Sequence, residues 1–146
     1  GSFVNEQVNT VNFLFCHEDN EYGANTGKRL AGTFNYLAEQ LLAARQAYPT
    51  RSYPNLGLLP ALRRESTSAP EGNIPEGLAI GNPDRIVEVI RKWESAGVDR
   101  INFLLNAVET VPQAEVLASM RLFAKEVMPK FAEKREAVPA GVAGGE

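Results

Sequence analysis

The pattern of apolar and polar positions is clearest between residues 78 and 105, where it predicts a strand, a helix and a second strand. Residues 78–81 and 101–105 are short apolar runs. Between them, apolar residues recur at helical spacing and charged residues take the opposite positions. Two apolar strands joined by a helix are typical of a parallel sheet, and a length of about 30 residues is usual for such a unit.

The ends of this predicted helix carry local signals that agree with it. Asn82 offers an N-cap oxygen, and Pro83 stands at the first helical position, where a missing N–H costs nothing. Asp84 places negative charge near the positive end of the helix dipole. Gly97 suits the position just after the last turn. We therefore expect a helix from residue 83 to about residue 96.

A second strand–helix unit precedes the central one. Alternation predicts a strand over residues 9–16, followed by a polar turn in which Asp19 or Asn20 caps a helix that reaches about residue 48. Gly27 and Gly32 interrupt this helix, which predicts a close packing contact or a frayed start. Its predicted buried stripe is Leu30, Phe34, Leu37 and Leu41.

A third unit follows, and the three together define a fold class. A final helix is predicted over about residues 113–128, with Thr110 and Gln113 spaced as a capping box. Three parallel strands with three helices are too few to bury both faces of a sheet, and they leave two open edges. A closed eight-stranded barrel needs about 250 residues. We therefore predict an α/β fold that is the C-terminal part, about three βα units, of a TIM (β/α)8 barrel.

Two segments differ in composition from the predicted elements. Residues 49–76 contain five prolines and a serine-rich stretch, and so long an irregular connection is usually a functional or a flexible loop. Residues 137–146 are small and are expected to form a flexible tail. The sequence therefore predicts one partial barrel domain at residues 1–136, including the loop 49–76, and a tail at 137–146.

Composition and charge narrow the classes of function. The net charge of −3 comes without a basic run, so nucleic acid is not an expected partner. No apolar stretch approaches about 20 residues, so we expect no membrane span and a cytoplasmic location. Cys16 is the only cysteine, which excludes an internal disulfide and a thiolate zinc cluster. The open sheet edges predict a homo-oligomer or a partner chain that covers them.

Several motifs, taken in order, resemble the bacterial luciferase-like, flavin-dependent monooxygenases. In that family a strand ending in Gly-x-Pro-Asp/Glu starts the penultimate helix, as at Gly81 to Asp84. Ala-Gly-Val-Asp leads into the last strand, as at Ala96 to Asp99. The closing helix of the family ends in Phe-Ala-x-Glu-Val-Met-Pro-x-Phe, as at Phe123 to Phe131. Phe13 to Asp19 is similar to the sixth strand and its turn. The resemblance covers most of residues 11–131.

The resemblance implies a barrel that uses reduced FMN, or F420 in some branches, to oxidise a small organic substrate with O2. About five strand–helix units of the family are absent here, and they hold most of the flavin phosphate contacts. The cofactor is therefore expected where the complete barrel is assembled, and the chain alone need not bind one. The alternatives are an F420-dependent oxidoreductase and a non-catalytic barrel fragment that acts as an assembly or binding piece.

Candidate site residues follow the predicted strands, because barrel sites lie on the loops after the strands' carboxyl ends. His17 is the only histidine and a candidate for proton transfer, or else a solvent-facing turn residue that caps the next helix. Gly81 and Asn82 start a helix and are candidates for binding a cofactor phosphate. Against this, Asp84 already places a carboxylate there and Pro83 removes a donor.

Three further residues are candidates for the substrate pocket. Cys16 ends its strand and lies near the expected mouth, or else is a small buried hydrophobe. Asn106 and Glu109 follow the last strand and are expected to face the mouth. The alternative is that they are ordinary polar residues of a surface loop. Glu18 and Asp19 are more typical of a solvated cap than of a metal pair, and no metal site is expected.

Overall fold

The computed structural model describes residues 7–46 and 76–132, and the fold below concerns those residues. The predicted tail 137–146 and the predicted loop 49–76, apart from Glu76, lie outside them. In chain order the elements are β1 (Asn9–Cys16), α1 (Asn20–Gln46), β2 (Ala79–Gly81), α3 (Pro83–Ser95), β3 (Arg100–Leu104), α4 (Gln113–Glu126) and α5 (Pro129–Ala132).

The three strands form a parallel sheet with β1 in the centre, in the order β2-β1-β3. β2 pairs with the carboxyl end of β1, where Leu14 lies opposite Ala79 and Cys16 opposite Gly81. β3 pairs with the first five residues of β1 along its other edge. The predicted α/β class and the parallel pairing are therefore confirmed.

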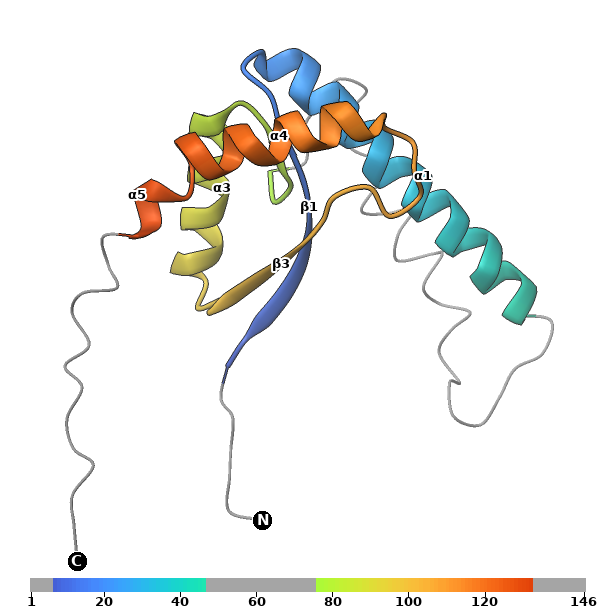
Figure 1. The fold of residues 1–146 in the computed structure, drawn as a ribbon. Helices are drawn as coiled ribbons and strands as arrows, with labels where there is room; N and C mark the ends of the chain where they lie inside the picture. Colours follow the sequence, from blue (N-terminus) through green and yellow to red (C-terminus); the bar gives the residue numbers. More distant parts are fainter. Residues whose placement is uncertain (1–6, 47–75, 133–146) are drawn as a thin grey trace, which may run out of the picture.

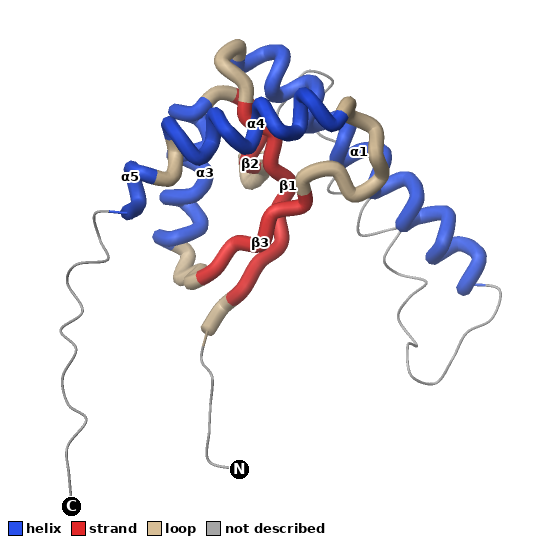
Figure 2. Tube along the Cα trace, in the orientation of Figure 1, coloured by secondary structure: helices blue, strands red, loops and turns tan. Residues whose placement is uncertain are grey.

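Helices lie on both faces of this sheet at β2 and the carboxyl half of β1, as can be followed in Figures 1 and 2. On one face, Leu30 of α1 packs with Phe15 and Ile80. On the other face, α3 packs against Leu14 and Cys16. Both faces are therefore covered at β2 and the carboxyl half of β1, whereas Val11 is 61% exposed and no residue of β3 is buried, so these helices do not bury both faces of the whole sheet, as expected. The chain moves from β1 to β2 and then back across β1 to β3, and right-handed crossovers in opposite directions place their helices on opposite faces.

This arrangement differs from an arc of a barrel. In a barrel the strands stand in chain order, so β2 would lie between β1 and β3, and all helices would cover one face. The structure shows a small α/β unit with a three-stranded parallel sheet, and the barrel itself stays a prediction.

The helix α4 crosses the edge of β1 that β3 leaves free. Near its start, Val116 packs with the cluster on the α1 face, and after its end Val127 packs with the cluster on the α3 face. Between them, Ser119 Oγ accepts a hydrogen bond of 2.7 Å from the backbone N–H of Cys16. A side chain thus satisfies a backbone donor beyond the last residue that pairs with β3.

The first half of α1 packs closely on β2 through glycine. A Cβ on Gly27 would overlap the side chain of Ile80, which confirms the close contact predicted there. Gly32 has nothing within 4 Å of the corresponding position. The predicted burial of Leu37 and Leu41 is wrong, because they are 43% and 71% exposed. The 27-residue helix is about 40 Å long and outruns the short strands beneath it.

The predicted signals around α3 are confirmed. The side chain of Asn82 accepts a hydrogen bond of 3.0 Å from the N–H of Arg85, and Pro83 begins the helix. Gly97 follows the helix with a φ of +86°, a left-handed conformation that favours glycine.

The capping box predicted before α4 is wrong. Pro112 stands at the N-cap and makes no side-chain cap hydrogen bond. The preceding loop is closed by Asn106, whose amide donates to the carbonyl of Val111 and accepts from its N–H. Thr110 Oγ1 is buried and finds no hydrogen-bond partner among the described residues. Within the described ranges, none of the helices combines the length and hydropathy that a membrane span requires.

Candidate functional site

A cavity of about 300 Å³ opens at the carboxyl end of β1, where the chain turns towards α1 and α4 crosses the strand's other edge. In doubly wound sheets, ligands bind outside the carboxyl ends of strands, where connections leave towards opposite faces. The cavity, termed here the β1 crevice, is lined by Phe15, Cys16, His17, Glu18, Tyr22, Glu115, Ala118, Ser119 and Leu122.

The floor of the β1 crevice is apolar and contains the single thiol. Cys16 is 1% exposed, and Phe15 beside it is 2% exposed. Burial raises the pKa of the Cys16 thiol to about 11, and the charge of Glu126 adds to the shift. The thiol is therefore neutral at physiological pH and behaves as a small buried hydrophobe rather than as a nucleophile.

The local turn after β1 positions His17 at the rim. Its N–H donates to the carbonyl of Gly81 at 3.0 Å, and its ring Nδ1 accepts from the N–H of Asp19 at 3.0 Å. Because Nδ1 accepts, the neutral ring carries its proton on Nε2, which is the atom left to donate a hydrogen bond to a ligand. Asp19 in turn caps α1 by accepting from the N–H groups of Glu21 and Tyr22.

A second polar pair joins α1 to α4 across the crevice. The Tyr22 hydroxyl donates to Glu115 Oε2 at 2.9 Å, and the ring of Tyr22 lies against that of His17, with centroids 4.5 Å apart. The hydrogen bond to Glu115 is the main cause that raises the pKa of Tyr22 above its ordinary value. The rim thus presents a neutral phenol, a carboxylate and an imidazole from three segments.

The sequence did not indicate Tyr22, Glu115 or Ser119 as site residues. Tyr22 and Glu115 stand in the first turns of the helices that follow β1 and β3, and that position is the one available signal. Their pairing depends on the path of α4 across β1, which no local pattern in the sequence indicates.

The predicted phosphate site at Gly81 and Asn82 does not fit a phosphate group. The N–H of Asn82 already donates to Asn20 Oδ1 at 3.1 Å, and the N–H of Arg85 donates to the side chain of Asn82. The neighbouring hollow, of about 330 Å³, contains the carboxylates of Glu18, Asp84 and Glu126. Its two lysines are paired with carboxylates, Lys130 with Asp84 and Lys125 with Glu126, each at 3.0 Å.

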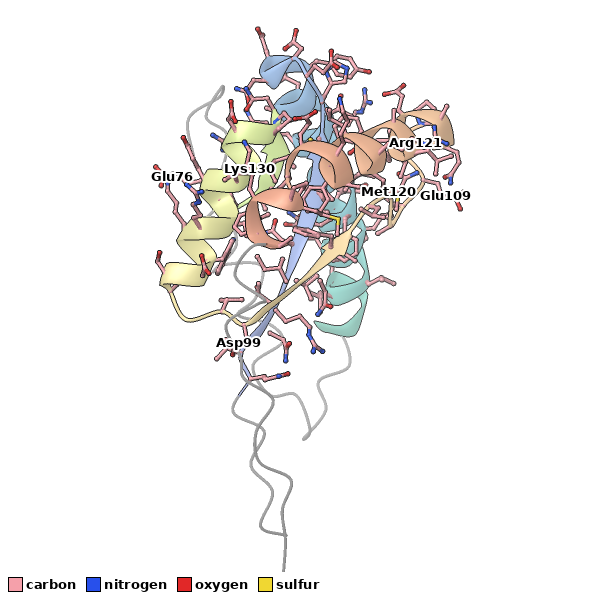
Figure 3. All side chains as sticks on the ribbon, turned by 60° about the vertical axis from the view of Figure 1, so that its left-hand side comes forward. Glu76, Asp99, Glu109, Met120, Arg121 and Lys130 are labelled. Atoms are coloured by element: carbon pink, nitrogen blue, oxygen red, sulfur yellow. The ribbon has the colours of Figure 1, made fainter. Side chains whose placement is uncertain are left out.

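The other predicted site residues divide into two groups. Cys16, His17 and Glu18 line the β1 crevice, whereas Asn106 and Glu109 do not. The Asn106 side chain is used to close its own loop, and Glu109 extends outward from that loop (Figure 3). In the part of the chain that the structure describes, no group of three or more His, Cys, Asp or Glu side chains could hold a metal ion.

Comparisons with known proteins give a likeness at the level of the fold. No family model matches the sequence, and no curated protein matches it. The crystal structure of the monooxygenase RslO1 from Streptomyces bottropensis is similar, with a TM-score of 0.58 and 16% sequence identity. The match covers 89% of this chain and 33% of that one, so the chain spans about a third of the length of that protein.

Proposed function

We propose that the chain is the C-terminal part of a luciferase-like, flavin-dependent monooxygenase, with the β1 crevice as one wall of the substrate pocket. The observation that carries the proposal is the crevice itself, an apolar cavity with a polar rim at the carboxyl end of the central strand. The motif order in the sequence and the fold-level likeness to a monooxygenase support it.

In this proposal, the chain supplies binding and orientation rather than the redox chemistry. The flavin, FMN or F420, would supply the oxidation of the substrate. The residues at Gly81 and Asn82 do not fit its phosphate, so in this proposal the phosphate contacts would come from outside the described residues. Phe15 and Leu122 exclude water from the floor of the crevice, and His17 holds a proton at Nε2.

The test compares flavins with and without a phosphate. The purified chain is titrated with FMN, F420 and riboflavin while flavin fluorescence and melting temperature are measured. We expect the isoalloxazine ring to bind weakly at the mouth of the crevice, with a dissociation constant on the order of 1 mM, about equally for FMN and riboflavin. His17→Ala should weaken this binding, and Glu88→Gln on the exposed face of α3 should leave it unchanged.

Two results would contradict the proposal in different ways. If none of the three compounds changes in fluorescence or shifts the melting temperature, the β1 crevice does not bind a flavin, and the proposal is contradicted. FMN that binds far more tightly than riboflavin would show a phosphate site within the chain, against the geometry at Asn82.

A second candidate function is a non-catalytic assembly piece, and the far half of α1 favours it. Tyr36, Leu37 and Leu41 are 59%, 43% and 71% exposed on one helix, and exposed apolar residues gathered on one element are typical of an interaction surface. This candidate predicts a colourless dimer or larger assembly, measured by light scattering. A measured mass of 15.9 kDa, which is that of a monomer, would exclude this candidate.

A further inference from the structure

We propose that the β1 crevice binds a primary amine attached to a small apolar or aromatic body. The inference names a substrate class for the crevice and rests on the proposed function for the crevice's role as a substrate pocket. It does not rest on the identity of the flavin. It follows from the shape, the charge and the aromatic rings of the lining residues.

The size and floor of the crevice select the body of the ligand. At about 300 Å³ the cavity is at the lower end of the range for small-molecule pockets, so it accommodates a single ring or a short chain. Phe15, Ala118 and Leu122 supply apolar surface, and the thiol of Cys16 is neutral. An apolar body gains free energy by leaving water for this floor.

The charges of the rim select the head group. Two carboxylates, Glu18 and Glu115, line the crevice, and none of its described lining residues is a lysine or an arginine. Glu115 is half-buried and is held in place by the Tyr22 hydroxyl at Oε2, so Oε1 can accept from a second donor. A ligand ammonium there would make a charge-assisted hydrogen bond, whereas a carboxylate or phosphate would meet like charge.

The adjacent rings of His17 and Tyr22 strengthen the preference for a cation. The rings of His17 and Tyr22 meet at the rim with an interplanar angle of 48°. A cation over the face of a tyrosine is attracted by the negative charge on the face of the ring. The charge of Arg29 acts on the Tyr22 hydroxyl, but Arg29 does not line the crevice. The charged side chains that line the rim are therefore negative.

The test uses two ligands with the same body and opposite charges. Phenethylamine and 3-phenylpropionate are titrated separately into the chain at pH 7, with binding measured by NMR shift changes and by melting temperature. We expect the amine to bind at least tenfold more tightly than the acid. Glu115→Gln should lower amine affinity about fivefold to tenfold and leave acid binding nearly unchanged, and Tyr22→Phe should have a smaller effect because the ring remains.

Control variants keep the test decisive. Glu88→Gln makes the same change of charge on the exposed face of α3 and should not alter amine affinity. The circular dichroism spectrum of each variant checks that it is folded. Equal binding of amine and acid, no binding of the amine at millimolar concentration, or an equal loss in Glu88→Gln would overturn the inference. Amine binding without any flavin effect would instead overturn the proposed function alone.

Discussion

At the scale of single residues, Cys16 shows how position decides chemistry. It ends β1, its backbone N–H is held by Ser119, and its side chain is buried between β1 and α4. A thiol in such surroundings is hard to ionise, because the thiolate loses its hydration without gaining a cation. Of the two interpretations that the sequence offers for Cys16, the small buried hydrophobe is therefore the one its surroundings favour.

Two measurements follow for Cys16. The thiol should not react with an aromatic disulfide reagent at pH 8 in the folded protein, and it should react at once in urea. The folded pKa of about 11 lies above the ordinary 9.0, so the unfolded chain releases its proton first and stability falls as pH rises from 9 to 11. Compared with Cys16→Ala, the wild type should lose about 1–2 kcal/mol of unfolding free energy between pH 8.5 and 10.5. A constant difference between the two proteins would contradict the burial argument.

At the scale of elements, the two halves of α1 lie in different environments, one against the sheet and one beyond it. Its first half lies on β2, where Gly23 approaches the backbone of Gly81 and Gly27 approaches Ile80. Its second half extends past the sheet, so Leu37 and Leu41 are exposed although their spacing continues the buried stripe. The same helix therefore has a tight glycine contact at one end and an uncovered apolar surface at the other.

A pair of glycine substitutions tests this division. Gly27→Ala should destabilise the protein by about 1–3 kcal/mol, because the added methyl group overlaps Ile80 and β2 must shift. Gly32→Ala is the matched control, and it should stabilise the protein by about 0.5–1 kcal/mol through helix propensity alone. Urea unfolding measures both. Similar effects for the two variants would argue against close packing of α1 on β2.

At the scale of the whole molecule, the strand order distinguishes this structure from an arc of a barrel. β3 occupies the edge of β1 that a preceding strand would take in a complete barrel, while β2 takes the other edge. An assembled barrel would need β3 to pair with β2 instead. The outer edges of β2 and β3 have no partner strand among the described residues, so a longer protein or a second chain could extend the sheet there.

A disulfide can report this strand order directly. Val11 and Asn102 are both exposed and lie opposite each other on β1 and β3. Neighbouring strands are about 4.8 Å apart, within the range of a disulfide, whereas an intervening β2 would roughly double that distance. The double variant Val11→Cys with Asn102→Cys should form an intramolecular disulfide under mild oxidation, detected by mass. The single variants control for cross-linking between molecules, and a double variant that stays reduced would favour the barrel order.

Much of the secondary structure was predictable because its signals are local. The bounds of β1 follow from alternation, and the ends of α3 follow from Asn82, Pro83 and Gly97. The candidate site was predictable in part, because Cys16 ends a strand and His17 directly follows it. The partners Tyr22 and Glu115 were missed because they lie 93 residues apart and meet only through the crossing of α4.

The sequence by itself determined the three strands, the extent of the longer helices, the ends of α3 and the position of His17 at a strand end, because periodicity and capping act within a few residues. Only the tertiary structure decided that β1 is central, that helices lie on both faces of its carboxyl half, and that the N–H groups of Asn82 and Arg85 donate to protein side chains at the start of α3. Those outcomes depend on the handedness of crossovers and on pairings between distant segments, which a local pattern does not contain.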